Sequence, residues 1–512
     1  MRKKLLKTFI GIFALSIGLA FSSCSFLGED GQQAVSLQYE LVNDSYKVVG
    51  IGNYEEGSLV IPETYKGKPV TAIGKEAFAR ELEIGHLTIP DSVTTIEERA
   101  FYSCPNLTNV TMGNGVTEIA SEAFAYCATL EVATLSDSLV SIGNQAFVGC
   151  VRLKEAHFPD TLKTIADSAY EECKVLHEVT FGDSLEIIGV RAFYNCIAIS
   201  KVEIPDGAPT DIFDSAFFGC AAIDRIILGD SVIGVGPSAF EGCSSAREVI
   251  IGDSVVSIGS RAFYSCRKFY EITLGKSLLM IGGSAFEKCW LLREIYNRST
   301  SLVITLGSLE KDGGIGYYAW YVRREGDPTR ISKDENGLVY YTDATKKALI
   351  AVELTKNTDL VVPDDVTEIA NYACYNEQLI VSLVVGNGCT RIGFSAFRNS
   401  YKINSVVLGD NVTTIADSAF RYNGYIVSIV GGKNLKTVGK EAFMKKEGDR
   451  YYKPYDTFYF TGTPTDWFAI QFGEGNEHLT VGVKTIAFYS EEAPTTTGTY
   501  WHYVDGKPTL WL

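Results

Sequence analysis

Apolar residues recur in the same order along most of the chain, with a period of 23 residues apart from one step of 24 between Phe193 and Phe217. The most regular position is aromatic and follows an alanine, and from Phe101 to Phe286 a cysteine stands three residues after it. The aromatic column comprises Phe78, Phe101, Phe124, Phe147, Tyr170, Phe193, Phe217, Phe240, Phe263 and Phe286. A fixed period of this length predicts a solenoid of stacked repeats, in which each coil buries its apolar face against its neighbours.

The unit from Leu107 to Leu130 reads LTNVTMGNGVTEIASEAFAYCATL and predicts the path of one coil. Val110 and Met112 alternate with polar residues, as expected for a short strand with every second side chain inward. Asn-Gly then marks a turn. The stretch I-x-x-x-A-F-x-x-C fits one or two helical turns with its apolar residues on one face. We therefore predict an α/β repeat solenoid of 23-residue coils, each with a short strand, a turn and a short helix.

These coils resemble the bacterial BspA-like leucine-rich repeat, whose consensus reads closely as L-x-x-V-x-I-P-x-x-V-x-x-I-G-x-x-A-F-x-x-C. LTIPDSVTTIEERAFYSC, ending at Cys104, and VIIGDSVVSIGSRAFYSC, ending at Cys266, match nearly every element. The resemblance extends over about residues 70 to 446, apart from one interruption. It implies a leucine-rich repeat array in a bacterial surface protein that functions in adhesion to host extracellular proteins or to other bacteria.

The period stops after Phe286 and resumes at Cys374, so the chain holds two arrays. A β-hairpin is predicted before each array, over residues 37–49 and 338–352, because terminal coils need a cap over their apolar edge. The expected segments are a signal peptide at 1–23, a tether at 24–36, an N-terminal β cap at 37–69, a first array of about ten coils at 70–296, a spacer that leaves the axis of the array at 297–336, a hairpin cap at 337–362, a second array of about four coils at 363–446 and an aromatic, β-rich C-terminal module at 447–512.

The first residues predict export. MRKKLLK is basic, and the apolar run from about Thr8 to Phe21 is shorter than the roughly 20 residues that a membrane-spanning helix needs. Phe21-Ser22-Ser23-Cys24 resembles the lipobox of bacterial lipoproteins, although leucine is usual where Phe21 stands. The resemblance implies that Cys24 becomes the lipidated first residue of a membrane-anchored surface protein. Ordinary signal cleavage that leaves a spare thiol is the alternative.

Charge narrows the range of partners. The chain has 46 basic and 62 acidic residues, a formal net charge of −16, which opposes binding to nucleic-acid phosphates and to anionic lipid surfaces. We therefore expect no nucleic-acid partner, and contact with a membrane only through the N-terminal lipid anchor. The oligomeric state is left open.

Nine cysteines occupy one equivalent position per coil, namely Cys104, Cys127, Cys150, Cys173, Cys196, Cys220, Cys243, Cys266 and Cys289. Their side chains should point the same way from coils stacked roughly 5 Å apart. A disulfide needs a Cβ–Cβ geometry that parallel side chains rarely provide. We predict a column of buried thiols that act as small apolar groups and weak hydrogen-bond donors. In the second array the equivalent residues are Glu377, Ser400, Asn423 and Lys446.

Catalytic signatures are weak in this chain. Gly182-Asp183-Ser184-Leu185 spells the nucleophile block of GDSL esterases, but similar turns recur at the same place in other coils. A nucleophile needs one base and one oxyanion site rather than a copy on every coil, so we interpret these residues as turns built by aspartate side chains. The five histidines are scattered, without H-E-x-x-H or paired-cysteine zinc spacing. We expect no enzyme activity, no metal and no cofactor.

The outward positions of the strands predict a candidate binding face. The inward and outward alternation around Val110 can be extended to the later coils. It predicts that the following side chains face solvent: Glu155, Glu178, Lys201, Glu203, Arg225, Glu248, Glu271, Glu294 and Tyr296. Like charges stacked on adjacent strands repel, which favours a basic partner or a cation, with partial relief from Lys201 and Arg225. A solvated face kept soluble by its charge is the alternative.

The aromatic segment 447–512 ends in YWHYVDGKPTLW, which resembles a terminal module of the same repeat family. Its rings either form the core of a small β-rich cap or stack on glycans. The sequence thus predicts a non-catalytic cell-surface protein whose solenoid recognises an extracellular protein or a glycan. The alternatives are a glycan- or ester-active enzyme that uses the C-terminal module, with the repeats as a targeting scaffold, and a purely structural envelope protein.

Overall fold

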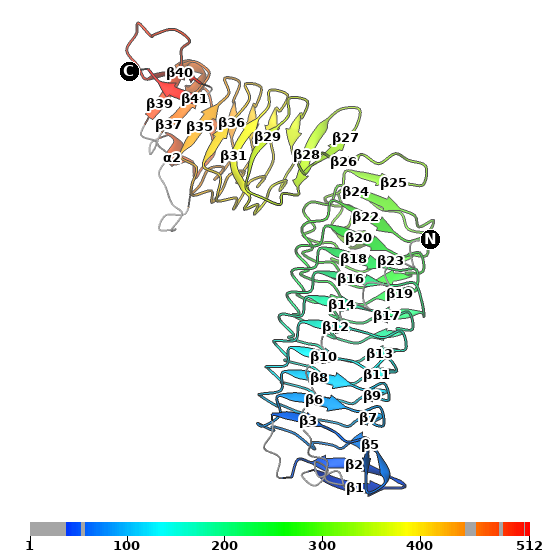
Figure 1. Cartoon of the computed structure of the whole chain (residues 1–512). Helices are drawn as coiled ribbons and strands as arrows, with labels where there is room; N and C mark the ends of the chain where they lie inside the picture. Colours follow the sequence, from blue (N-terminus) through cyan, green and yellow to red (C-terminus); the bar gives the residue numbers. More distant parts are fainter. Residues whose placement is uncertain (1–36, 53–56, 446–456, 481–484, 506, 512) are drawn as a thin grey trace.

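The computed structural model describes residues 37–52, 57–445, 457–480, 485–505 and 507–511. The expected signal peptide, the tether and Cys24 lie outside these residues. The described chain forms two stacks of coils that follow one another at an angle (Figure 1). Each stack is a parallel β-solenoid, in which every coil contributes one strand to each of two faces.

In the first array, the longer strands lie on one face. They are β3 (Ser58–Val60), β6 (His86–Ile89), β8 (Asn109–Met112), β10 (Val132–Thr134), β12 (Glu155–His157), β14 (Glu178–Thr180), β16 (Lys201–Ile204), β18 (Arg225–Leu228), β20 (Glu248–Ile251), β22 (Glu271–Leu274), β24 (Glu294–Asn297) and β25 (Tyr321–Arg323). The neighbouring strands that pair on this face are parallel. In β6 and β8, for example, His86 lies opposite Asn109.

The second face carries shorter strands in a 13-stranded sheet, which begins with the hairpin β1 (Gln38–Val42) and β2 (Ser45–Gly50). This antiparallel hairpin stands where the sequence predicts one. The remaining members are β4 (Thr64–Tyr65), β5 (Lys68–Ile73), β7 (Thr95–Ile96), β9 (Glu118–Ile119), β11 (Ser141–Ile142), β13 (Thr164–Ile165), β15 (Ile187–Ile188), β17 (Thr210–Ile212), β19 (Val232–Val235), β21 (Ser257–Ile258) and β23 (Met280–Ile281).

The second array repeats this plan from the antiparallel hairpin β27 (Leu338–Thr342) and β28 (Lys347–Val352), again at the predicted place. One of its sheets contains β29 (Thr358–Val362), β31 (Ile380–Val385), β33 (Ser405–Val407), β35 (Ser428–Gly431), β37 (Thr457–Phe460), β39 (Thr485–Tyr489), β40 (Tyr500–Val504) and β41 (Lys507–Leu510). The other contains β26 (Ile331–Lys333), β27, β28, β30 (Glu368–Ile369), β32 (Arg391–Ile392), β34 (Thr414–Ile415), β36 (Thr437–Val438) and β38 (Gln471–Phe472).

The helix predicted in each coil is wrong. In the coil of Phe124, the segment forms the two-residue strand β9 and then a series of tight turns. Glu122 and Tyr126 have φ values of 55° and 60°, which no right-handed helix contains. The amide of Phe124 donates to the carbonyl of Ala146 in the next coil at 2.8 Å. Backbone hydrogen bonds thus run along the array, and the described helices are only the 3-10 turn η2 (Asp312–Gly314), α1 (Pro464–Phe468) and α2 (Glu477–Thr480).

The aromatic column forms the core of the first array, as predicted. The rings of Phe101 and Phe124 stack with centroids 5.1 Å apart and planes 3° apart, and Phe193 and Phe217 repeat this geometry. All four side chains are fully buried. Because each ring is covered by the rings of the coils on either side, packing couples neighbouring coils.

The thiol column is also buried, and every described cysteine is free. The Sγ of Cys127 donates to the carbonyl of Phe101 at 3.1 Å, and the other column cysteines repeat this bond to the preceding coil. In the second array, Ser400 and Asn423 donate to the equivalent carbonyls at 2.7 and 2.8 Å. Serine or asparagine can therefore replace the thiol, which indicates a structural position.

The column thiols are expected to resist Ellman's reagent in the folded protein near neutral pH. Burial raises the pKa of Cys150 and Cys173 well above the usual range, so the reactive thiolate forms only at pH values far above neutral. Unfolding in guanidinium chloride should expose all of them. Thiol titration before and after unfolding checks this, and rapid labelling of Cys104–Cys289 in the folded protein would contradict it.

Residues 297–336 do not form the expected spacer that leaves the axis. Strand β25 pairs in parallel with β24 and extends the sheet by one strand, and the amide of Phe286 donates to the carbonyl of Gly313 at 2.9 Å. Residues 297–323 therefore continue the first array as one long, irregular coil, whereas β26 pairs with β27 and already belongs to the second array. The glycine-rich part of this long coil supplies the tight turns, since Gly313 and Gly314 have φ values of 62° and 77°.

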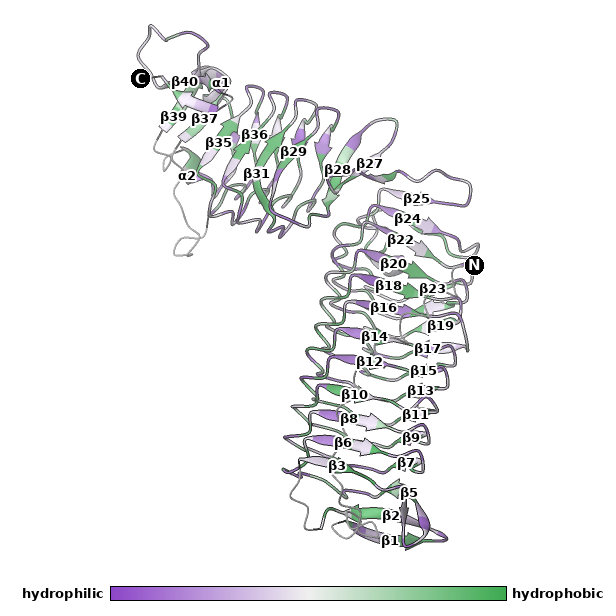
Figure 2. Ribbon diagram, in the orientation of Figure 1, coloured by the Kyte–Doolittle hydropathy of each residue, from purple (hydrophilic) through white to green (hydrophobic). Residues whose placement is uncertain are grey.

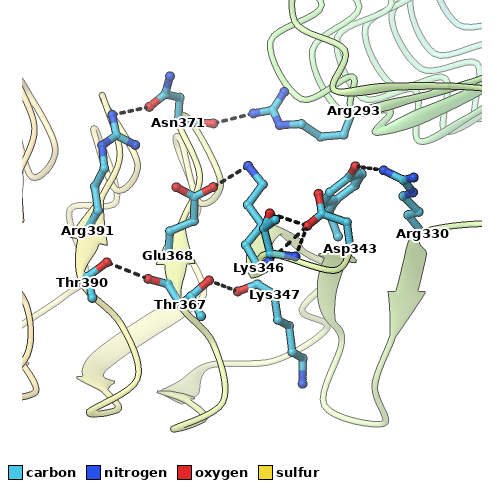
Figure 3. A network of polar contacts seen from close by, with 12 residues as sticks. Arg293, Arg330, Asp343, Lys346, Lys347, Thr367, Glu368, Asn371, Thr390 and Arg391 are labelled. Atoms are coloured by element: carbon cyan, nitrogen blue, oxygen red, sulfur yellow. Dashed lines mark hydrogen bonds and ion pairs between the residues drawn. The ribbon is translucent and has the colours of Figure 1, made fainter.

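The two arrays meet at a junction of polar and aromatic contacts, and Figure 3 shows the polar contact of Arg293 with Asn371 within it. Arg293, at the end of the first array, is buried, and its Nη2 donates to the carbonyl of Asn371 in the second array at 2.8 Å. The ring of Trp290 stacks on Tyr372 with centroids 4.9 Å apart, and Tyr270 donates to Glu353 at 3.0 Å. These contacts join coils that lie far apart in the sequence.

The aromatic C-terminal segment continues the second array. Strand β37 pairs in parallel with β35, and β39 pairs in parallel with β37. Phe458, Phe460, Trp467 and Trp501 are buried, and Trp501 Nε1 donates to the carbonyl of Phe460 at 3.2 Å. These rings cover the last coils, which is the role expected of a cap.

Candidate binding face

The longer strands of the first array place the predicted face in register. Glu155 lies opposite Glu178 across β12 and β14. Arg225 lies between Lys201 of β16 and Glu248 of β20. Figure 2 shows that several of these strands begin with hydrophilic residues on the same side. We refer to Glu155, Glu178, Lys201, Glu203, Arg225, Glu248 and Glu271 as the charged ladder.

Alternation within each strand produces this ladder. In β16, Lys201 is exposed and Glu203 half-buried, while Val202 and Ile204 are buried. Successive residues of a strand point to opposite faces, so the aliphatic side chains enter the core and the charged ones line the surface. Neighbouring strands lie about 4.7–4.9 Å apart, which fixes the spacing between the rungs of the ladder.

Ion pairs neutralise the middle of the ladder. Arg225 Nε lies 2.7 Å from Glu248 Oε2, and Arg225 Nη1 lies 3.4 Å from Glu203 Oε1. Lys201 Nζ also lies 3.4 Å from Glu203. Because these side chains are 39–46% exposed, each pair contributes roughly 0–1 kcal/mol to stability. Their main effect is to order the charges on the surface.

The negative charges of the carboxylates at the start of the ladder are neutralised less than those in the middle. Glu155 and Glu178 are in register, and the cationic partners of Glu155 are two histidines. His157 Nε2 lies 3.4 Å from Glu155 Oε2, and His177 Nε2 lies 3.9 Å from Glu155 Oε1. His157 Nδ1 also contacts Thr180 Oγ1 at 3.1 Å. This end of the ladder therefore stays acidic whenever the histidines are neutral.

Glu294 is not on the exposed face, contrary to expectation. Its side chain is 1% exposed, because β25 and the following chain cover it. Arg323 Nε donates to Glu294 Oε1 at 2.8 Å, and the backbone amide of Arg330 donates to Oε2 at 2.8 Å. Tyr296 is half-buried beneath the guanidinium of Arg323, which lies 3.8 Å from the ring centroid. Both residues therefore help close the first array.

Glu271 is the last exposed carboxylate of the ladder. Partial burial and the carboxylate of Glu294, which lies opposite it across β22 and β24, raise the pKa of Glu271. The ladder thus ends where residues 321–330 cover the next rung.

The aspartate turns connect successive coils. Asp91 Oδ1 accepts from the amide of Asn114 in the next coil at 2.7 Å, and Asp230 Oδ1 accepts from the amide of Asp253 at 2.6 Å. These bonds of the aspartate side chains span 23 residues and so join one coil to the next. Each such carboxylate or amide oxygen satisfies a backbone donor at the edge of the next coil.

The described residues contain no group of histidine, cysteine and acidic side chains that could hold a metal ion. Across the same residues, no helix is long and apolar enough to cross a membrane.

Comparison with known families gives one clear match. The family described as BspA type leucine rich repeat region matches residues 71–200, 186–308 and 352–448, more than half of the chain. A search of curated proteins found no match.

Several solved structures are similar to this chain. A leucine-rich repeat protein from Bacteroides ovatus is 20% identical, with 88% of this chain and 99% of that chain covered and a TM-score of 0.44. The leucine rich repeat protein of T. pallidum is 25% identical, with 42% and 89% covered and a TM-score of 0.33. A leucine rich cell surface protein from Faecalibacterium prausnitzii is 18% identical, with 88% and 99% covered and a TM-score of 0.28.

Proposed function

Because this chain belongs to the family of BspA type leucine rich repeat proteins, we propose that it is a non-catalytic binding protein of the bacterial surface. Its charged ladder recognises an extracellular protein that presents basic side chains. The observation that carries this proposal is the register of the ladder. Glu155 and Glu178 lie opposite one another across β12 and β14, and Lys201, Arg225 and Glu248 lie in register across β16, β18 and β20.

The charge pattern favours a basic protein partner. Glu155 and Glu178 repel one another at the start of the ladder, and a lysine or arginine placed between them would remove this repulsion. The net charge of −16 would also speed association with a basic surface. A rigid row of charges with a fixed spacing suits a protein surface, since complementary charges then fix orientation as well as affinity.

The proposed location at the bacterial surface is supported by the first residues of the chain. The basic start, the apolar run and the lipobox-like Phe21-Ser22-Ser23-Cys24 support export followed by lipidation of Cys24. Mass spectrometry of the mature N-terminus tests this step. A diacylated or triacylated Cys24 supports the anchor, and an unmodified cysteine would make the protein a secreted one.

We propose a non-catalytic protein because the turn that resembles an esterase motif is repeated along the array. Aspartate turns like the one that resembles an esterase motif occur in many coils, and in several of them the aspartate carboxylate accepts a hydrogen bond from a backbone amide of the next coil. A catalytic nucleophile instead needs a single base and a single oxyanion site.

Reversing the acidic end of the ladder is expected to weaken binding at least tenfold. The double variant Glu155→Lys/Glu178→Lys converts this end to a basic surface, while both positions are exposed strand residues that the core does not need. Binding to an array of immobilised extracellular matrix proteins, read by surface plasmon resonance at low and physiological salt, measures the effect. Added salt should weaken wild-type binding, because exposed charges are screened.

The control is Glu118→Lys/Asp211→Lys, which makes the same change of charge on exposed positions of the shorter strands β9 and β17. This variant should bind as the wild type does. Equal loss in both variants would show that net charge alone matters, and unchanged binding by Glu155→Lys/Glu178→Lys would exclude the ladder. Removing residues 447–512 is a poorer test, because Phe458, Phe460 and Trp501 are part of the core.

A further inference from the structure

A cavity of about 170 Å³ lies at the junction of the two arrays, apart from the charged ladder. Its walls come from the last coils of the first array, through Arg267, Lys268 and Trp290, and from the first coil of the second array, through Tyr372 and Glu377. A cavity of about 150 Å³ is large enough for one benzene molecule, so this one matches a single six-membered ring.

Two cations line the cavity without an acidic partner. Neither Arg267 nor Lys268 forms an ion pair with any carboxylate that the structure describes, although this acidic chain pairs many of its other cations. Arg267 Nε donates to Ser265 Oγ at 2.8 Å, and its guanidinium lies 4.7 Å from the ring centre of Trp290. The guanidinium is thereby held in place with further N–H donors left for a ligand. Arginine and lysine in such a position favour a carboxylate.

Aromatic rings form the apolar part of the wall. Trp290 and Tyr372 stack with centroids 4.9 Å apart, and Tyr375 meets Trp290 edge-on at 5.2 Å. Tyr372 and Tyr375 are only half-buried, so part of their ring surface remains available. The electron-rich face of an aromatic ring packs well against the C–H groups of a saturated ring.

Hydrogen-bonding groups complete the lining. Ser244 and Ser245 offer hydroxyls, Asn376 offers an amide, and Glu377 offers a carboxylate whose Oε1 already accepts from the amide of Leu379 at 2.9 Å. A few convergent polar groups of this kind orient a small ligand. A ligand with one carboxylate, several hydroxyls and an apolar ring face satisfies all three parts of the wall.

We propose that the junction cavity binds a carboxylated monosaccharide, such as a uronic acid unit of an acidic glycan. Its carboxylate pairs with Arg267 and Lys268, its ring packs on the tyrosines, and its hydroxyls bond to the serines, Asn376 and Glu377. Because the two arrays supply opposite walls, the bound sugar also links them and restrains their relative motion.

Isothermal titration calorimetry of the whole protein with glucuronate tests the proposal, with glucose and inorganic phosphate as comparison ligands. Glucuronate should bind with a Kd of about 1 mM, the value that an ordinary ligand efficiency gives for a molecule of about thirteen non-hydrogen atoms. Glucose and phosphate should each bind at least tenfold more weakly. Equal affinity for glucose, or for phosphate, would overturn the assignment of a carboxylated sugar.

The variant Arg267→Met/Lys268→Met should lose at least tenfold in glucuronate affinity. The control is Arg152→Met/Lys154→Met, which removes two exposed cations from another coil of the first array and should bind glucuronate as the wild type does. Circular dichroism and thermal unfolding check that both variants are folded. The proposal is contradicted if Arg267→Met/Lys268→Met binds glucuronate as tightly as the wild type does. It is also contradicted if the wild type shows no binding at a glucuronate concentration tenfold above the expected Kd.

Discussion

Replacing Phe217 with alanine is expected to lower the free energy of unfolding by about 3–5 kcal/mol. The ring is fully buried and stacks between Phe193 and Phe240 with centroid distances of 5.1 Å on both sides. Its removal leaves a cavity that neighbouring coils cannot fill, because their backbones are joined by hydrogen bonds such as Phe217 N to Ala239 O at 2.7 Å. Since coils contact only their neighbours, the loss should also weaken the coupling between the two halves of the array.

Urea unfolding followed by circular dichroism measures this effect. Phe213→Ala in the same coil is the matched control, because Phe213 is 42% exposed and should change stability by less than about 1 kcal/mol. A separate early transition in Phe217→Ala would show that the halves unfold independently. Equal stabilities of the two variants would contradict the account of the aromatic column.

Replacing Glu294 with alanine is expected to cost about 3 kcal/mol and to release the coil that closes the first array. The carboxylate is buried and accepts from Arg323 Nε and from the backbone amide of Arg330, both at 2.8 Å. Removing it leaves a mostly buried cation and a backbone donor without their acceptor, which is more costly than losing an exposed ion pair. Thermal unfolding measures the stability, and limited proteolysis should show new cleavage within residues 321–336.

Glu271→Ala is the control on the preceding rung. Its pKa is raised, so the folded protein disfavours the charged carboxylate near neutral pH, and removing it should leave stability unchanged or slightly higher. The sign follows because a raised carboxyl pKa makes the folded state bind the proton more tightly, so stability at this site falls as the pH rises through that pKa. If Glu294→Ala is as stable and as protease-resistant as Glu271→Ala, the closing role of Glu294 is wrong.

Much of the fold could be predicted from the sequence because the period is visible in single residues. The stack of Phe101, Phe124 and their equivalents, the buried thiols and the two hairpins all follow from positions that recur every 23 residues. The register of Glu155 with Glu178 follows in the same way, since equal coils place equal positions side by side.

The helix within each coil could not be predicted correctly, because Ile119, Ala123 and Phe124 have a spacing that suits either a helical face or a chain of turns. The positive φ angles of Glu122 and Tyr126 decide between the two, and neither residue is a glycine that would signal them. Hydrogen bonds to the next coil stabilise this backbone, so the coil depends on its neighbours rather than on local preference.

The contacts made by residues outside the 23-residue repeat could not be predicted either. Glu294 keeps the outward register of its strand, but a later, aperiodic segment covers it. Arg293 and Trp290 join the second array through contacts with Asn371 and Tyr372, which lie 78 or more residues away along the chain. No local pattern in the sequence marks such contacts, so the junction and its cavity emerge only from the folded chain.

Carboxylate footprinting of the protein bound to its strongest partner on the matrix-protein array tests the central claim most directly. Carbodiimide labelling with glycine ethyl ester, read by mass spectrometry, reports the exposure of individual glutamates. Labelling of Glu155, Glu178 and Glu248 should fall when the partner is bound, while labelling of Glu118 on the opposite series of strands should not change. Loss of labelling at Glu118, with the ladder still labelled as in the free protein, would contradict binding through the charged ladder.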